Sequence, residues 1–192
     1  MDIFDVQIQK CQILLSQRRT KVQVLPKSTT KFKVISESEK TCCITGVDNE
    51  NAVLYKLPET IQGYKVVEIK TGAFGNCHRI KNIIFPNTLK KISYNCIPEY
   101  ACDISSIYIP KSVEFIGRNF GGCKDLSSII VDPENKYYDS RDNCNAIIET
   151  STNKLVFGCY TTTIPNSITS IGPSAFYSCS KLKTIYIPNS VT

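Results

Sequence analysis

The sequence has only one histidine and lacks the short motifs by which metal and phosphate sites are recognised. Its ten cysteines include no C-x₂-C pair, so the sequence does not indicate a zinc site. His78 directly follows Cys77, and adjacent side chains generally point apart, which argues against a Cys–His catalytic pair. Residues 120–123 contain two glycines but neither the spacing nor the lysine of a phosphate loop. We therefore expect no enzyme activity, no catalytic residue, no metal and no cofactor.

Long apolar runs and concentrated charge are also absent. No stretch approaches the roughly 20 apolar residues that a membrane-spanning helix requires. The start of the chain has Asp2 and Asp5 where a signal peptide needs basic residues, so we expect no signal peptide within this chain. The net charge of +6 comes from scattered lysines and arginines. We expect neither membrane insertion nor nucleic-acid binding.

What the sequence does contain is a repeated unit, whose idealised form is I-G-x-x-A-F-x-x-C-x-x-L-x-x-I-x-I-P-x-S-V. The cycle restarts 23 residues after Ile69, and four copies are legible, beginning at Ile69, Ile92, Ile116 and Ile171. The second copy is loose and the third is one residue short. Self-similarity at this period predicts a solenoid, in which each unit buries its apolar face only by stacking on its neighbours.

Each position of the repeat has a structural role. The I-x-I step predicts a short strand whose alternate side chains stack in the core. The core-facing residues are Ile83 and Phe85, Ile107 and Ile109, Ile129 and Val131, and Ile185 and Ile187. The A-F-x-x-C step predicts one helical or 3₁₀ turn on the opposite wall, filled by Phe74, Phe120 and Phe176. Gly117 and Gly172 fit tight corners where a Cβ would crowd.

The segment 164–176, Ile-Pro-Asn-Ser-Ile-Thr-Ser-Ile-Gly-Pro-Ser-Ala-Phe, resembles the BspA-type leucine-rich repeat, also called the Treponema-type repeat. This family occurs in bacterial surface proteins and in some protozoan proteins. The resemblance covers roughly residues 57–192 and implies a mainly β, right-handed leucine-rich-repeat solenoid with short helical or 3₁₀ turns. It also implies a role in adhesion and protein recognition, and it carries over no catalytic residue.

Two segments depart from the repeat. At about 132–163 the pattern breaks, and two short apolar runs around the polar turn 151–154 predict an inserted β-hairpin. Residues 31–36 and 41–46 predict a second hairpin, which would cap the N-terminal end of the solenoid. Residues 1–28 fit either a strand pair or a helix. We therefore divide the chain into an N-terminal segment with a β-rich cap, 1–56, and a solenoid, 57–192.

The cysteines recur with the repeat. Cys77, Cys123 and Cys179 occupy the same repeat position, and Cys102 lies near it in the pattern. A small buried hydrophobic residue in a stacked column would recur in this way. We therefore expect the three column cysteines to be buried and reduced.

The function expected from this sequence is protein recognition without catalysis, in a fragment of a bacterial cell-surface or secreted adhesion-type protein. The alternatives are a structural spacer or stalk that presents another domain, and a cytoplasmic location. The expected partner is a host or cell-surface protein, and the C-terminal repeat edge is expected to allow self-association.

The middle residue of each I-x-I step points away from the core and is expected to form the binding row. Outward side chains of short sheets also serve cross-strand packing, which is the structural alternative. The row consists of Ile84, Tyr108, Ile130 and Tyr186, and its polar flank of Asn82, Ser106, Ser128 and Thr184. Tyr108 and Tyr186 are the expected anchors.

Overall fold

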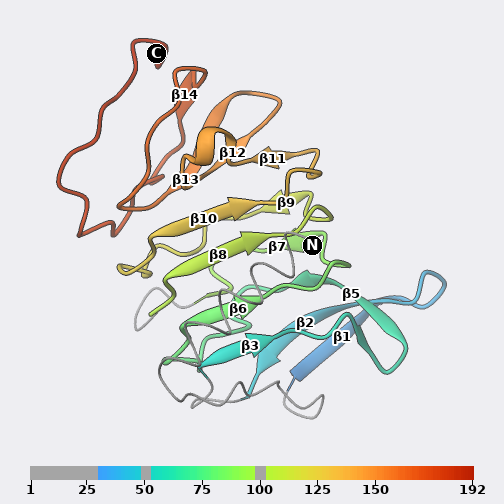
Figure 1. The fold of residues 1–192 in the computed structure, drawn as a ribbon. Coiled ribbons are helices and arrows are strands. Elements are labelled where there is room, and N and C mark those ends of the chain that lie inside the picture. The colour runs from blue at the N-terminus through green and yellow to red at the C-terminus, as the bar shows by residue number, and fades with distance from the viewer. Residues whose placement is uncertain (1–29, 49–52, 98–102) are drawn as a thin grey trace, which may run out of the picture.

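The computed structural model describes residues 30–48, 53–97 and 103–192, which form a stack of short strands (Figure 1). The fold is mainly β, an open solenoid with an N-terminal hairpin and an inserted hairpin, which confirms the fold class predicted from the sequence. Residues 1–28 and Cys102 lie outside the described residues. No helix in the described part of the chain is long and apolar enough to cross a membrane.

The I-x-I steps form the first of two parallel ladders. Three of the four predicted steps are strands here, and each adds one rung next to the rung of the preceding turn. The rungs are β3 (Leu54–Lys56), β6 (Asn82–Ile84), β8 (Ser106–Ile109) and β10 (Ser128–Val131). β3 pairs with β6 and β8 pairs with β10, while β6 lies beside β8 as the neighbouring rung without being paired to it. Tyr55, Ile83, Ile107 and Ile129 point inward from them and are at most 5% exposed. The alternation within the I-x-I step therefore placed Ile83, Ile107 and Ile129 correctly, whereas Tyr55 was not predicted.

The isoleucines that begin the first three repeats lie on a second parallel ladder, which the sequence pattern did not predict; Ile171 lies in a separate sheet. Its strands are β2 (Thr41–Val47), β5 (Tyr64–Ile69), β7 (Lys91–Ile92) and β9 (Phe115–Ile116). The A-F-x-x-C steps beside this ladder are single turns, in which the Cys77 N–H donates to the Phe74 carbonyl oxygen at 2.9 Å. The predicted turns are thus present, and they connect two walls of strands.

The N-terminal hairpin joins the second ladder directly. β1 (Thr30–Ser36) pairs antiparallel with β2, as predicted, and β2 pairs in parallel with β5. The short strand β4 (Thr60–Ile61) pairs with β5 on its way into the first full repeat. The hairpin therefore covers the edge that the first solenoid turn would otherwise expose.

The insertion forms a sheet of its own beyond β10. β12 (Ala146–Glu149) and β13 (Lys154–Gly158) form the predicted antiparallel hairpin. β11 (Tyr138–Asp139) extends this sheet beside β12, and β14 (Ser170–Ile171) pairs in parallel with β13. A 3₁₀ turn, η2 (Arg141–Asn143), connects β11 to the hairpin.

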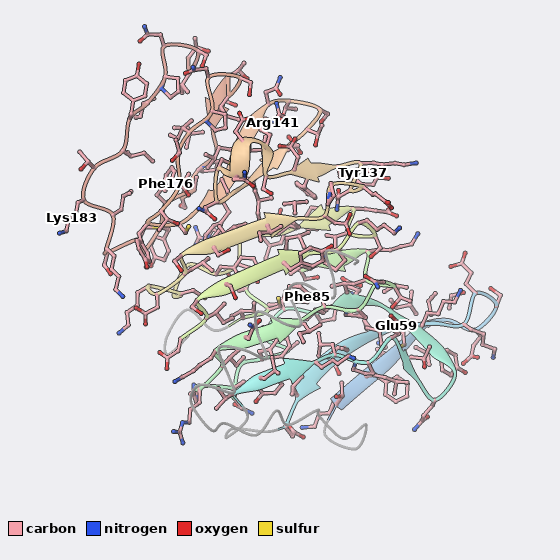
Figure 2. The ribbon with its side chains drawn as sticks, viewed as in Figure 1. Glu59, Phe85, Tyr137, Arg141, Phe176 and Lys183 are labelled. Atoms are coloured by element: carbon pink, nitrogen blue, oxygen red, sulfur yellow. The ribbon has the colours of Figure 1, made fainter. Side chains whose placement is uncertain are left out.

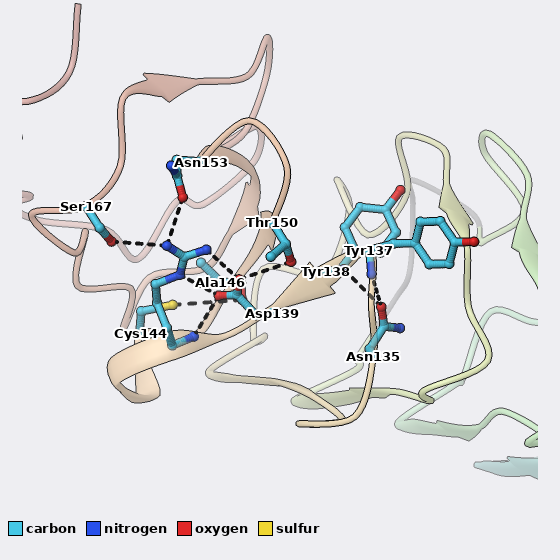
Figure 3. A network of polar contacts seen from close by, with 10 residues as sticks. Asn135, Tyr137, Tyr138, Asp139, Cys144, Ala146, Thr150, Asn153 and Ser167 are labelled. Atoms are coloured by element: carbon cyan, nitrogen blue, oxygen red, sulfur yellow. Dashed lines mark hydrogen bonds and ion pairs between the residues drawn. The ribbon is translucent and has the colours of Figure 1, made fainter.

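One arginine connects the insertion to the last repeat (Figure 3). Arg141 forms a two-pronged ion pair with Asp139, with N–O distances of 2.8 and 2.5 Å. The same guanidinium donates to the Asn153 side chain at 2.9 Å and to the Ser167 hydroxyl at 3.4 Å. Burial raises the pKa of Asp139, but the bonds from Arg141 lower it by more, so the net pKa is below its ordinary value.

The interior divides into two packed regions. The main core runs from Cys42 to Cys159 and contains Phe74 and Phe120 as the predicted fillers. A smaller core under the last repeat consists of Cys144, Ala146, Ile148, Leu155, Ile164, Ile168 and Ala175. Phe176 packs against this smaller core and is only half-buried. The last repeat is therefore held by fewer buried side chains than the turns before it.

The last I-x-I step does not form a strand, so the prediction that Ile185 and Ile187 stack in the core is wrong in part. Ile185 packs against the smaller core, but Ile187 is 52% exposed. In the preceding turn the equivalent segment, 161–164, is itself not a strand. Thr161 and Thr162 instead donate their hydroxyls to carbonyl oxygens of Ser127 and Asn145. The final step therefore has no ladder to extend.

The column cysteines are only partly as predicted. Cys77 is buried and in the thiol form, and its thiol donates to the Val47 carbonyl oxygen at 3.5 Å. Cys179 is free but half-buried, with its thiol 3.6 Å from the Gly158 carbonyl oxygen. Cys123 is buried but disulfide-bonded, so the prediction of a reduced thiol is wrong there. Because Cys77 and Cys179 are both thiols, the column is not cross-linked through them.

Candidate interaction surface

The first ladder brings three of the four predicted row residues together, and one of them is the expected anchor Tyr108. Tyr108 and Ile130 are directly paired across β8 and β10, and Ile84 is paired with Lys56 across β6 and β3. All three predicted residues are half-buried, because neighbouring rungs cover part of each side chain. We call Ile84, Tyr108 and Ile130 the strand row.

The polar flank of the strand row is also assembled. Ser106 and Ser128 are directly paired, and the Asn82 amide donates to the Ser106 hydroxyl at 3.5 Å. The hydroxyl of Tyr108 donates to the Asp132 carboxylate at 2.6 Å. The ring of Tyr108 is thus held in one orientation, with its edge fixed by the carboxylate.

Tyr186 and Thr184 do not belong to this surface. Both lie in the C-terminal segment that forms no strand, and Tyr186 is 72% exposed. Figure 2 shows Lys183, in the same segment, on the outlying loop beside the stack. The predicted row, which was expected to be interrupted only near the insertion, is therefore wrong at its last member, Tyr186, because the ladder ends before it.

A second surface, which sequence reasoning missed, lies on the other ladder. Tyr94 is 57% exposed and Phe115 36% exposed, and their rings meet edge to face with centroids 5.7 Å apart. They border a groove of about 540 Å³, whose lining includes the buried rings of Tyr138 and Phe157. No residue of the strand row is as exposed as these two aromatic residues.

The groove exists because the second ladder is interrupted. β11 begins one 23-residue period after β9, where the next rung of this ladder falls due. β11 pairs with β12 instead, and the Tyr138 hydroxyl accepts the Ile116 N–H at 3.1 Å. The Tyr138 side chain thus occupies the position where the backbone of a neighbouring strand would pair with β9. The 23-residue spacing between Phe115 and Tyr138 is the sequence feature that could have indicated this position.

Charged side chains border the groove on both sides. Arg118 lies on the β9 side, 5.4 Å from the Tyr177 ring, and donates to the Ser174 hydroxyl at 3.4 Å. Lys154 lies on the β13 side, and in the described part of the chain no ion pair to its ammonium is formed. Glu149 is the one carboxylate in the groove lining, and it accepts a hydrogen bond from the Thr152 hydroxyl.

A buried carboxylate lies on the same ladder, outside the groove lining. Glu68 is 7% exposed and accepts hydrogen bonds from Lys70 at 2.8 Å, Ser93 at 2.9 Å and Lys91 at 3.2 Å. Burial raises the pKa of Glu68, but these hydrogen bonds lower it by more, so the net pKa is below its ordinary value. Because its charge is already satisfied, Glu68 stabilises the fold and is not a candidate acid or base.

The described residues contain no cluster of three or more His, Cys, Asp or Glu side chains that could hold a metal ion. Cys77 is fully buried, whereas His78 is exposed. The two side chains therefore lie on different sides of the backbone, as expected for neighbours in sequence.

The model of the protein family described as "BspA type Leucine rich repeat region" matches this chain at residues 55–155 and 150–192, with six copies of the repeat. A solved leucine rich cell surface protein from Faecalibacterium prausnitzii A2-165 is 26% identical over 74% of this chain and 37% of its own, with a TM-score of 0.59. The leucine rich repeat protein of T. pallidum is 19% identical over 86% of this chain and 72% of its own, with a TM-score of 0.50. No curated protein matches the chain in sequence.

The pneumococcal vaccine antigen PcpA is 20% identical over 73% of this chain and 40% of its own, with a TM-score of 0.52. The matches below 25% identity show a shared fold. The chain spans 37% of the length of the Faecalibacterium protein, so the activity of such a whole protein does not transfer to it directly.

Proposed function

Because the chain belongs to the BspA-type leucine-rich repeat family, we propose that it is a non-enzymatic scaffold that recognises another protein. We further propose that it is part of a bacterial cell-surface or secreted protein of adhesion type. The support for the location is the Faecalibacterium relative, which is named as a cell surface protein. The fold supplies long strand-lined faces, which are the surfaces that solenoids use for binding.

The observation that carries this proposal is the strand row. Ile84, Tyr108 and Ile130 form a contiguous apolar row at the centre of the first ladder, with hydroxyl and amide side chains beside it. An apolar centre with a polar rim is the usual arrangement of a protein interface. Tyr108 is suited to be the anchor, because its bond to Asp132 fixes the ring before any partner arrives.

The competing function is a spacer that presents another domain and binds nothing itself. The two functions differ in one property, saturable binding by the isolated chain. The labelled chain should be applied to an array of purified ectodomains of membrane and extracellular proteins. Recognition predicts saturable binding to at least one ectodomain, whereas a spacer predicts none.

A further inference from the structure

One edge of β9 carries backbone groups that face the groove, whereas the opposite edge pairs with β7. β9 pairs with β7 through the N–H groups of Phe115 and Gly117, which donate at 3.1 and 2.8 Å. Because successive residues of a strand direct their polar groups to opposite sides, Ile116 directs its N–H and C=O away from β7. The N–H is taken by Tyr138, and in the described part of the chain no hydrogen bond reaches the Ile116 carbonyl oxygen.

The Tyr138 hydroxyl provides one hydrogen-bond donor in the groove. Its hydroxyl accepts the Ile116 N–H and retains a hydrogen of its own, for which no acceptor occurs among residues 30–48, 53–97 and 103–192. The groove therefore presents an acceptor, the Ile116 carbonyl, and a donor, the Tyr138 hydroxyl, at the position where a further strand would pair. An extended peptide carries the complementary N–H and C=O on each residue.

The aromatic border supplies an apolar contact beside these polar groups. The Tyr94 ring packs edge to face on Phe115, and the Lys91 ammonium lies 5.6 Å from the Phe115 ring centroid. Both rings are thus oriented by neighbours while remaining exposed. Rigid aromatic side chains of this kind give large contact area at low entropy cost.

The charge of the groove favours an acidic occupant. Its lining contains two cations, Arg118 and Lys154, and one carboxylate, Glu149, which gives a local charge of plus one. The Lys154 ammonium has no carboxylate partner in the described part of the chain. The whole chain is also positive, at +6. An acidic partner would therefore be attracted to this side and held in place by Lys154.

We propose that this groove binds an extended acidic segment of a partner protein. The segment pairs with the edge of β9 through Ile116 and Tyr138, places an apolar side chain against Tyr94 and Phe115, and sets a carboxylate near Lys154. This site deepens the proposed recognition function and rests on it. It is separate from the strand row, since the two lie on different ladders.

The test uses the whole chain and a phage-displayed library of random octapeptides. The peptides that enrich are then synthesised, and their affinity is measured by fluorescence polarisation. Two pairs of variants of the chain, each checked by thermal melting, separate the groove from general effects. Lys154→Glu is matched by Lys183→Glu, which changes the same charge on the outlying segment (Figure 2). Phe115→Ala is matched by Tyr137→Ala, which removes another exposed aromatic ring.

The expected result is enrichment of peptides that carry Asp or Glu beside aromatic or β-branched residues. Lys154→Glu and Phe115→Ala should each weaken the best peptide by roughly tenfold or more, while their matched variants and Tyr108→Ala leave it within about twofold. Methylation of one peptide N–H should abolish binding, because it removes the donor to Ile116. Analytical ultracentrifugation should give the same oligomeric state for the wild-type chain and for Phe115→Ala, which shows that the groove does not bind a second copy of the chain.

The proposal is overturned if no peptide enriches, if the enriched peptides lack acidic residues, or if Lys154→Glu binds them as well as the wild type. Peptides that lose affinity only with Tyr108→Ala would also overturn it, while leaving the recognition function in place. Self-association removed by Phe115→Ala would assign the groove to a second copy of the chain. Groove-dependent peptide binding without any ectodomain binding would contradict the proposed function alone.

Discussion

The side chain of Asn119 accepts the backbone N–H of Cys96 at 2.8 Å, and so joins the corners of two successive turns. Its amide nitrogen donates to the carbonyl oxygens of Ser93 at 2.8 Å and Gly117 at 3.0 Å. Asn119 is 4% exposed, so each of these groups would be buried without a partner if the amide were removed. One amide thus satisfies three backbone groups at a point where no strand pairing is available.

Asn119→Ala should lower the free energy of unfolding by about 2–4 kcal/mol, because a buried backbone donor and two acceptors lose their partner. Urea unfolding followed by circular dichroism measures this loss. Asn189→Ala, at an exposed asparagine in the C-terminal segment, is the control and should stay within about 0.5 kcal/mol of wild type. Equal stability of the two variants would show that the amide is not a structural bridge.

Gly117→Ala should also destabilise the chain. A Cβ at Gly117 would lie 2.5 Å from the backbone nitrogen of Tyr94, which cannot move aside without shifting β7. We expect a loss of about 1–3 kcal/mol by urea unfolding. At Gly46, by contrast, a Cβ would meet the flexible Lys31 side chain at 3.3 Å, so Gly46→Ala should cost much less. A wild-type midpoint for Gly117→Ala would contradict the close packing of this corner.

Glu68 should make stability depend on pH in the acid range. Its folded-state pKa lies below the ordinary value of 4.5, so it stabilises the fold above that value, and this contribution is lost as the pH falls through the lowered pKa. Unfolding of wild type and Glu68→Gln should be compared at about pH 7 and about pH 3. Glu68→Gln should have a lower free energy of unfolding than wild type at the higher pH, and this difference in free energy should be smaller at the lower pH. A gap that does not change with pH would rule out a charged Glu68 as its source.

The cysteines should fall into separate classes in thiol labelling followed by mass mapping. Burial raises the pKa of the Cys96 thiol to about 12, so Cys96 should resist alkylation in the native protein and react after denaturation. Cys77 should behave in the same way, because it is fully buried and is not disulfide-bonded. Cys123 should label only after reduction. Labelling of denatured Cys123 without a reductant would contradict its disulfide.

The first ladder and both hairpins could be predicted because their residues alternate between core and surface over several positions. The later part of the second ladder could not, since β7 and β9 are two-residue strands, Lys91–Ile92 and Phe115–Ile116, whose first residues differ in chemical character. Glu68, Lys91 and Phe115 are paired in register on this ladder, and they are an acid, a base and an aromatic residue. A strand two residues long leaves no periodic signal in the sequence.

The errors at the end of the chain have a different origin. The segment around Tyr186 has the same local pattern as β8, but a strand also needs a neighbour with free backbone groups. Thr161 and Thr162 use the preceding turn for side-chain hydrogen bonds, so that neighbour is missing. The groove was missed for a related reason, because it depends on where β11 pairs and not on which residues it contains.

The central claim, recognition through the strand row, is tested most directly by the affinity of single variants for an ectodomain that binds the wild-type chain. Tyr108→Ala removes the anchor ring, and Tyr186→Ala removes an equally large ring that lies off the ladder. Melting curves identify any loss of fold, and Tyr108→Phe retains the ring without its bond to Asp132. We expect Tyr108→Ala to weaken binding by roughly tenfold or more, Tyr108→Phe by less, and Tyr186→Ala by less than about twofold. Wild-type affinity in a folded Tyr108→Ala variant would contradict the claim.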